Sequence, residues 1–228
     1  MCMAKTFSSW RGAWCVAVLA LGMTACSSLP QPPQAVVRYD LGVAPALSTP
    51  VVAASASALA PIALGPIQTP LQADGNTAVR YRLAYADAQV LHAYTQAHWS
   101  LPPGTMVLQR LREHLSEGGR IVLSAEPGAI PPSVQGRQVP VLHLALEEFS
   151  QVFSSVQDSV GWVRVRATLV DPAPQGDVLL AQQVFDVRQP AAAPHAAAGV
   201  QALAQGVDLI GQHMRQWLTS GVVPQRTP

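Results

Sequence analysis

A short apolar run that ends at Cys26 divides the sequence and limits which residues can belong to a fold. Lys5 and Arg11 precede an apolar stretch from about Ala13 to Gly22, and small residues then lead to the cysteine. At roughly ten residues the stretch is too short to span a bilayer, which needs about 20, but it fits the apolar region of a secretory signal. The segment Leu19-Ala-Leu-Gly-Met-Thr-Ala-Cys26 therefore predicts a lipoprotein signal peptide over residues 1–25. Cys26 is then the lipidated residue, modified by diacylglyceryl and palmitate.

The cysteine count agrees with this division. Cys2, Cys15 and Cys26 are the three cysteines, and cleavage before Cys26 removes the first two, so the mature chain cannot form an internal disulfide. A lone cysteine in an exported protein needs another role, and lipidation supplies one. The alternative, an ordinary buried cysteine near the end of a membrane anchor, is disfavoured by the polar, proline-rich stretch that follows it.

The residues next to Cys26 bear on where the protein is anchored. Met23 departs from the aliphatic residue favoured at the first lipobox position, whereas Thr24 and Ala25 suit the next two. Ser27 stands where an Asp would resemble the inner-membrane retention signal of enterobacterial lipoproteins. We therefore expect an outer-membrane lipoprotein that faces the periplasm.

The charge of the chain argues against a nucleic-acid partner. Loss of Lys5 and Arg11 with the signal peptide leaves 12 basic against 13 acidic side chains. A nucleic-acid binder needs a basic surface to neutralise phosphates. Apolar residues make up 49% of the sequence and charged residues only 12%, so the chain can build a sizeable core.

Composition also sets the expected domain boundaries. Residues 26–59 are rich in Pro, Ala and Ser, which predicts an extended tether that holds the domain off the membrane. Tyr39-Asp40-Leu41 is a candidate pairing segment within it. The folded domain is expected over residues 60–220, followed by a tail over residues 221–228.

Period-two alternation predicts strands in the folded part. Residues 79–85 alternate Val, Tyr, Leu and Tyr with Arg80, Arg82 and Ala84, and residues 161–170 alternate Val163, Val165, Ala167 and Leu169 with Arg164, Arg166 and Thr168. The other expected strands are 62–67, 120–126, 141–150 and 179–187, and 91–99 is a weaker candidate.

Two segments have helical spacing. Val107, Leu108, Leu111 and Leu115 follow Thr105, a candidate cap, and Gly118-Gly119 ends this helix. The apolar residues from Val200 to Trp217 repeat every three or four positions, which predicts an amphipathic helix. Because the later strands are joined by short turns, antiparallel pairing is favoured. The expected fold is α+β, an antiparallel β-sheet with two helices packed on one face, in a two-layer sandwich.

No catalytic or metal-binding pattern stands out. The six histidines form no HExxH motif, the chain has no CxxC, and Ser124 lacks the flanking glycines of a nucleophile elbow. Glu147 and Glu148 are adjacent on a strand, which predicts side chains on opposite faces. We therefore expect no enzyme activity, no metal and no cofactor.

Four arginines are the candidate partner surface. Arg80, Arg82, Arg164 and Arg166 would form a basic patch on the exposed sheet face if their strands are neighbours, suited to an acidic partner or phospholipid head groups. The alternative is ordinary solvated positions. Trp99 and Trp162 are either interface anchors or core residues.

Several segments together resemble a known family, the ABC-type transport auxiliary lipoproteins, which include paraquat-inducible protein C. The segments run in order from about residue 60 to 218: Ala63-Leu-Gly-Pro-Ile67, Tyr81-Arg-Leu-Ala-Tyr-Ala-Asp87, His98-Trp-Ser-Leu-Pro-Pro103, Leu108-Gln-Arg-Leu111, Glu147-Glu-Phe-Ser-Gln-Val-Phe153, Val163-Arg-Val-Arg-Ala-Thr-Leu-Val-Asp171, Leu179-Leu-Ala-Gln-Gln-Val-Phe185, Pro190-Ala191 and Trp217-Leu218. The stretch His92-Ala-Tyr-Thr-Gln-Ala-His98 departs from the clearer aromatic-acidic core of the family.

The resemblance implies an accessory role in lipid traffic across the periplasm. Its expected partners are an MCE-domain protein and the ABC permease of the same system, with the membrane bound through the N-terminal lipid. Direct phospholipid binding and homo-oligomer formation stay open. A carrier that holds a lipid between sheet and helices is the alternative function, and an envelope hydrolase using Ser124 and His143 is a third.

Overall fold

The computed structural model describes residues 35–43, 59–70 and 75–224. The expected signal peptide, Cys26, most of the expected tether and the last four residues lie outside these ranges. The described elements belong to one compact unit that begins at Val36. In order they are β1 (Val37–Tyr39), β2 (Ile62–Gln68), β3 (Ala78–Leu83), β4 (Asp87–Trp99), α2 (Pro103–Ser116), η1 (Glu117–Gly119), β5 (Val122–Ser124), β6 (Ser133–Val134), β7 (Arg137–Gln138), β8 (Val141–Phe153), β9 (Ser159–Asp171), β10 (Val178–Pro190), α3 (Ala196–Trp217) and η2 (Leu218–Val222).

β8 is the strand around which the main sheet is built. Along one side it pairs with β9 over its whole length, and β9 pairs in turn with β10. Along its other side it pairs with β2 at residues Val141–Ala145 and with β3 at residues Gln151–Phe153. β5 extends the sheet beyond β2, and β4 and β1 extend it beyond β3.

The sheet is mixed, so the prediction of an antiparallel sheet is only partly right. β8, β9 and β10 are antiparallel to one another, as the short turns predict, and so are β3 and β4. The pairs β1–β4, β2–β5, β2–β8 and β3–β8 are parallel. These parallel pairs join strands that are distant in sequence, where no short turn constrains direction.

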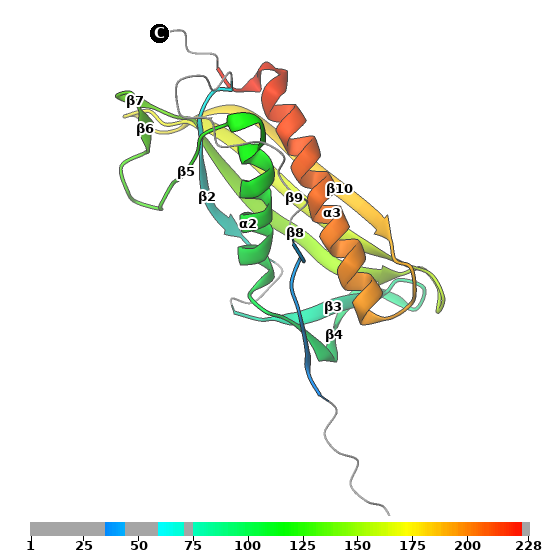
Figure 1. The fold of residues 1–228 in the computed structure, drawn as a ribbon. Coiled ribbons are helices and arrows are strands. Elements are labelled where there is room, and N and C mark those ends of the chain that lie inside the picture. The colour runs from blue at the N-terminus through cyan, green and yellow to red at the C-terminus, as the bar shows by residue number, and fades with distance from the viewer. Residues whose placement is uncertain (1–34, 44–58, 71–74, 225–228) are drawn as a thin grey trace, which may run out of the picture. The chain divides into compact units, whose positions relative to one another are not determined.

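Helices α2 and α3 lie on one face of the sheet, as predicted, which makes an α+β two-layer arrangement (Figure 1). The alternating residues Val163, Val165, Ala167 and Leu169 of β9 are all 0% exposed. They pack with apolar side chains of β8, α2 and α3 in a single core: Leu142, Leu144, Leu111, Leu115, Leu203, Val207, Ile210 and Met214. We call this the inner face of the sheet and the opposite one the outer face.

Glycines let α3 lie very close to the sheet. A Cβ on Gly161 of β9 would come within 2.6 Å of the backbone nitrogen of Leu203, and one on Gly199 would come within 2.1 Å of the Gln151 side chain. A Cβ on Gly211 would come within 2.4 Å of His114 on α2. The close packing of α3 on the sheet and on α2 therefore depends on residues without a side chain.

The helix ends differ in detail from the prediction. α2 begins at Pro103, with proline in the first turn, and Thr105 does not act as its cap. Proline suits this position because the first backbone N–H groups of a helix have no intrahelical partner. Gly118 and Gly119 follow α2 with φ values of 73° and 80°, which explains why the helix ends there. None of the described helices is long and apolar enough to cross a membrane.

Candidate functional site

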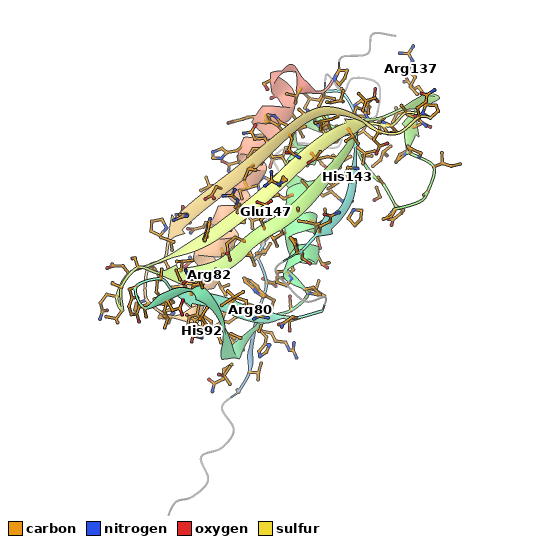
Figure 2. All side chains as sticks on the ribbon, turned by 180° about the vertical axis from the view of Figure 1, so that it is seen from behind. Arg80, Arg82, His92, Arg137, His143 and Glu147 are labelled. Atoms are coloured by element: carbon orange, nitrogen blue, oxygen red, sulfur yellow. The ribbon has the colours of Figure 1, made fainter. Side chains whose placement is uncertain are left out.

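The outer face of the sheet carries the arginines singled out from the sequence. Figure 2 shows this face, with Arg80, Arg82, His143 and Glu147 labelled on it. Arg80 and Arg82 come from β3, and Arg164 and Arg166 from β9. Their strands are not neighbours, because β8 lies between β3 and β9. The four side chains therefore share one face without forming an uninterrupted basic patch.

Glutamates of β8 occupy the space between the two pairs of arginines. Glu147 Oε2 accepts from Arg164 Nε at 2.9 Å, and its Oε1 accepts from Arg166 Nε at 2.7 Å. On the other side, Glu148 Oε2 accepts from Arg82 Nη2 at 3.0 Å. The central strand thus links the two arginine-bearing strands through ion pairs.

A β-bulge makes this arrangement possible and overturns one prediction. Leu146 pairs with Val165 and Glu148 pairs with Arg164, so Glu147 is an extra residue in β8. A bulge interrupts the alternation of side chains along a strand. Glu147 and Glu148 consequently both lie on the outer face with Arg164, whereas strict alternation predicted opposite faces.

β10 completes the set of charges. Asp186 Oδ2 accepts from Arg164 Nη1 at 3.0 Å, and its Oδ1 accepts from Trp162 Nε1 at 3.0 Å. The guanidinium carbon of Arg188 lies 4.3 Å from the centroid of the Trp162 ring, in cation–π contact. We define the outer-face array by its five arginines and three carboxylates: Arg80, Arg82, Arg164, Arg166, Arg188, Glu147, Glu148 and Asp186. The array has two more positive than negative charges.

The ion pairs shift the protonation equilibria in the array. Burial raises the pKa of Glu147, but hydrogen bonds and charges from Arg164 and Arg166 outweigh it, and the net pKa is lowered. Hydrogen bonds to Glu147 and Asp186 raise the pKa of Arg164. Among the ion pairs of the described residues none involves Arg80, so no carboxylate of the array neutralises its charge.

The two tryptophans weighed as anchors have different roles. Trp99 is 1% exposed and lies in the core, with its ring centroid 5.2 Å from that of Phe149. Trp162 is half-buried on the outer face, where it contacts Arg188 and Asp186. Only Trp162 therefore belongs to the candidate surface.

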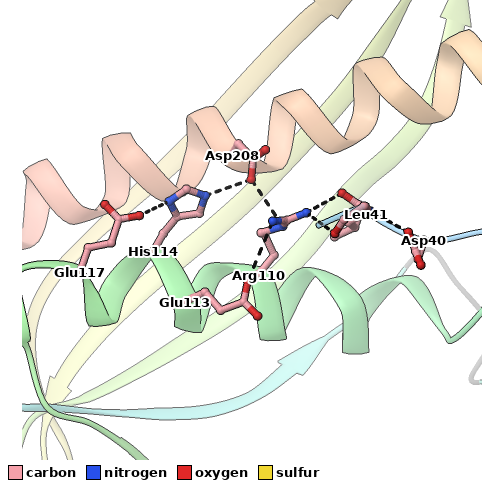
Figure 3. Close-up of polar contacts among 8 residues, drawn as sticks. Asp40, Leu41, Arg110, Glu113, His114, Glu117 and Asp208 are labelled. Carbon is pink, nitrogen blue, oxygen red and sulfur yellow. Dashed lines mark hydrogen bonds and ion pairs between the residues drawn. The ribbon is translucent and has the colours of Figure 1, made fainter. Parts of the chain in front are cut away.

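A second polar cluster lies between α2 and α3 and was not predicted from the sequence (Figure 3). Asp208 of α3 contacts two side chains of α2, His114 Nε2 at 3.0 Å and Arg110 Nε at 3.5 Å. Glu117 contacts the other ring nitrogen of His114 at 2.9 Å and Arg215 Nη1 at 2.7 Å. Arg110 and His114 are each 4% exposed, so this network joins the helices where little water reaches.

Arg110 also holds the N-terminal segment of the described chain. Its Nη2 donates to the backbone carbonyls of Leu41 and Gly42, at 2.5 and 2.9 Å. Leu41 is 8% exposed and belongs to the core, and β1 just before it pairs with β4. Residues 37–42, part of the expected tether, are thus attached to the domain. The strand that pairs is Val37–Tyr39, so only Tyr39 of the candidate pairing segment 39–41 lies in it.

Arg120 makes a similar attachment at the start of β2. Its Nη1 donates to the carbonyl of Ala60 at 2.7 Å, and its Nη2 to that of Leu218, after α3, at 3.5 Å. The side chain is buried, and burial lowers its pKa. Two buried arginines thus fasten the chain on both sides of residues 44–58.

Neither cluster forms a metal centre. In the described part of the chain no group of three or more His, Cys, Asp or Glu side chains could hold a metal ion. Ser124 and His143, named for the hydrolase alternative, lie on β5 and β8 with β2 between them. What the arrangement offers is a charged sheet face for contact with another molecule and a buried network that fixes the N-terminal segment.

Comparison with solved structures shows that other proteins share this fold. Protein XCC0632 from Xanthomonas campestris matches with a TM-score of 0.58 and 18% identity over 82% of this chain and 94% of that one. A second, uncharacterized protein matches with a TM-score of 0.56 and 13% identity over 81% and 99% of the two chains. Lipoprotein GNA1162 from Neisseria meningitidis is a looser match, with a TM-score of 0.35 and 16% identity over 71% and 99%. At these identities the first two likenesses show the fold alone.

The family assignment comes from the sequence. The ABC-type transport auxiliary lipoprotein component family matches residues 39–215, which run from the last residue of β1 to near the end of α3. The chain belongs to this family. A search of the curated proteins found no match. Membership defines a lipoprotein that assists an ABC-type transporter, and it agrees with the resemblance drawn from the sequence segments.

Proposed function

We propose that the protein is a lipid-anchored, non-enzymatic periplasmic component of an MCE/ABC-type lipid transport system. In this role it docks the transporter at the outer membrane, through a lipid on Cys26. The observation that carries the proposal is the family match over residues 39–215, which covers α2, nearly all of α3 and the strands of the main sheet from β2 to β10. The MCE-domain protein and the ABC permease are its proposed partners.

The outer-face array is the proposed docking surface for the MCE-domain protein. The helices cover the inner face, so the outer face is the broad sheet surface left for contact (Figures 1 and 2). The array has an excess of positive charge, which favours an acidic partner. Because most of its arginines are held by glutamates or Asp186, the positions of these charges are fixed before a partner arrives.

The test is cross-linking of the full-length lipoprotein in living cells, followed by mass spectrometry of the captured proteins. We expect capture of an MCE-domain protein, and we expect Arg80→Glu to reduce it strongly, because this change reverses a charge without breaking a described ion pair. The double change Arg164→Glu and Arg166→Glu should abolish it. Arg112→Glu is the matched control, since Arg112 lies on α2, on the other side of the sheet.

The results also separate the alternatives. Equal capture by the Arg80 and Arg112 variants would show that the array is not the docking surface. Capture of phospholipid alone, without an MCE-domain protein, would favour the carrier alternative. Retained transport after substitution of Ser124 and His143 would remove the hydrolase.

A further inference from the structure

β10 leaves one side of its main chain unpaired in the part of the molecule that the structure describes. It pairs with β9 along one side, no described strand pairs with it along the other, and Figure 1 shows it at the margin of the sheet beside α3. The other end strands, β1 and β5, have three residues each, whereas β10 has 13. Short strands, prolines and bulges normally protect a sheet edge against further strands. The bulge of β10 lies between Leu179 and Ala181, and Pro190 is its last residue, so the edge from Gln182 to Gln189 is regular.

The direction of the main chain shows which residues of β10 face the free side. Ala191, just after β10, donates its backbone N–H to the carbonyl of Ser159 at 2.9 Å, so its main chain is directed toward β9. In a regular antiparallel ladder this direction alternates from one residue to the next. The residues that direct their N–H and C=O groups to the free side are therefore Gln182, Val184, Asp186 and Arg188. A strand that adds to this edge has to pair with these residues.

Two of these residues carry opposite charges, and each can take a further partner. The Arg188 side chain is 60% exposed, and its ion pair with Asp186 of the same strand is long, at 3.8 Å. Asp186 already accepts from Arg164 and Trp162, but a carboxylate has about four acceptor positions. A strand that places a carboxylate opposite Arg188 and a guanidinium opposite Asp186 would therefore complement the edge.

A second copy of β10 has this arrangement of charges. Two identical antiparallel strands are related by a twofold axis. If the axis passes through Val187, Asp186 of each copy lies opposite Arg188 of the other. Both residues direct their main chains to the free side, so they form a hydrogen-bonded pair of the new ladder as well as an ion pair.

Other positions of the twofold axis lack this match. An axis through Asp186 or through Arg188 places like charges opposite each other, which is destabilising. An axis through Phe185 places Asp186 opposite Val184, so its charge gains no partner. An axis between two residues brings a main chain directed to the free side opposite one directed toward β9, which allows no regular ladder. The charges therefore select Val187 as the position of the axis.

A polar groove beside the edge suits the same register. One wall is formed by Gln183–Asp186 of β10 and the other by residues of α3 and η2, at His213, Gln216, Trp217 and Ser220. With the axis at Val187, Gln189 of the second copy lies opposite Phe185, on the side of the sheet where the groove lies. Its amide both donates and accepts hydrogen bonds, as the polar lining of the groove requires.

We propose that the protein forms a symmetric dimer in which β10 of one copy pairs antiparallel with β10 of the other, with the twofold axis at Val187. The two sheets then form one continuous sheet, with the helices of both copies on one face and both outer-face arrays on the other. Pro190 has no N–H to donate, so the pairing ends there. The dimer goes beyond the proposed function, since it requires no MCE-domain protein.

The experiment measures disulfide formation in the full-length lipoprotein, in its own cell envelope, after mild oxidation. Val187→Cys should give a disulfide-linked dimer, because residue 187 lies opposite itself in a non-hydrogen-bonded pair, with Cα atoms about 4.5 Å apart, within the range for a disulfide. Gln189→Cys is the matched control: residue 189 is half-buried on the same face but lies opposite Phe185, so its dimer yield should be about tenfold lower. The parent protein, without an introduced cysteine, gives the background.

Charge variants in the Val187→Cys protein test the register. Arg188→Glu places a carboxylate opposite Asp186 and should lower the dimer yield about fivefold. Arg112→Glu makes the same change of charge on α2, and Arg80→Glu makes it on β3, so both should leave the yield unchanged. Light scattering of the purified full-length protein should give the mass of two chains, and of one chain after Arg188→Glu. Unchanged thermal unfolding of the variants shows that the fold is intact.

Four results would overturn the inference: no disulfide-linked dimer from Val187→Cys, equal yields from Val187→Cys and Gln189→Cys, a yield that Arg188→Glu does not change, or a disulfide product with another protein in place of the second copy. If the dimer forms as expected and no MCE-domain protein is captured in the cross-linking test, the dimer stands and the proposed function fails. If an MCE-domain protein is captured and Val187→Cys gives no dimer, the proposed function stands and the dimer fails.

Discussion

Glu147 is the residue on which the outer-face array depends most. It accepts hydrogen bonds from Arg164 and Arg166 at once, and Arg164 in turn contacts Asp186. Without the carboxylate of Glu147, the positive charges of Arg164 and Arg166 on β9 would lie side by side, and Asp186 would be their only counter-charge in the array. The residue therefore controls both the stability and the charge of the proposed docking surface.

Glu147→Gln should lower the free energy of unfolding by up to about 1 kcal/mol at pH 7, a modest value because the arginine side chains are more than a third exposed and solvent screens the pairs. The pKa of Glu147 is lowered on folding, so its stabilisation is present above the ordinary carboxyl pKa and disappears as pH falls through the lowered value. The measurement is urea unfolding of parent and variant from pH 7 to acid. Their difference should shrink at acid pH.

Glu126→Gln is the control for this series, because Glu126 is exposed and makes no described ion pair. A Glu147 variant that loses the same stability at every pH would contradict the role of its charge.

Arg110 is the residue that joins three parts of the chain. Arg110→Met keeps an apolar side chain of similar length but leaves the carbonyls of Leu41 and Gly42 and the carboxylate of Asp208 without their guanidinium partner. Breaking a buried ion pair on one side costs about 3 kcal/mol, and we expect a loss of that size in urea unfolding. Limited proteolysis should also show faster cleavage within residues 36–43.

Arg112→Met tests whether the effect is specific to Arg110. Arg112 is on the same helix, and its guanidinium makes one long hydrogen bond, 3.5 Å to the carbonyl of Val122. A similar loss of stability in both variants would mean that helix packing, rather than attachment of the N-terminal segment, is responsible.

At the level of elements, the contact between α3 and β9 depends on Gly161. Gly161→Ala would place a Cβ within 2.6 Å of the Leu203 backbone nitrogen, and backbone cannot move aside as a side chain can. Overpacking of a close contact typically costs 1–3 kcal/mol, so we expect a loss of about 2 kcal/mol in thermal or urea unfolding.

Gly206→Ala is the comparison on the helix side of the same contact. Its Cβ would meet the side chain of Val163 at 3.0 Å, which can adjust, and alanine gains helix propensity of about 1 kcal/mol over glycine. The expected change is therefore small. A larger loss at Gly206 than at Gly161 would contradict the close backbone approach.

Local sequence patterns predict most of these elements but not their pairing. The alternation at Val163–Leu169 and the helical spacing from Val200 to Trp217 both correspond to observed elements, because burial of one face imposes the period. The parallel pairs of β2 and β3 with β8 depend on contacts distant in sequence. The bulge at Glu147 adds one residue to β8, and alternation alone cannot locate such an insertion.

The buried network between the helices was also beyond sequence reasoning. Arg110, His114 and Asp208 read as polar positions on two separate amphipathic helices, and His114 and Asp208 are 94 residues apart. Only the crossing of α2 and α3, where Gly211 makes room for His114, brings them together. A helical pattern shows which face is apolar, but it does not show which polar residues at its margin will meet.

For the whole molecule, the attachment of β1 determines how far the domain can lie from its proposed lipid anchor. The expected tether spans residues 26–59, yet Arg110 and β4 hold the chain at residues 37–42, and Arg120 holds it again at Ala60. Only the residues between Cys26 and Val37 then separate membrane from domain. A fully extended chain of that length spans at most about 35 Å.

This predicts that inserted residues act differently at two places. A Gly/Ser spacer of about 20 residues, which adds an average reach of roughly 25 Å, should move the domain away from the membrane when placed within residues 27–35. The same spacer within residues 44–58 should leave the distance unchanged, because both flanks are held by the domain. The measurement is energy transfer from a dye on Gln157→Cys to a membrane dye, with the full-length lipoprotein in vesicles.

Arg110→Met combined with the insertion within residues 44–58 should increase the distance, since it releases residues 37–42 from the domain. Equal effects of the two insertions in the parent protein would show that β1 and Arg110 do not hold the segment.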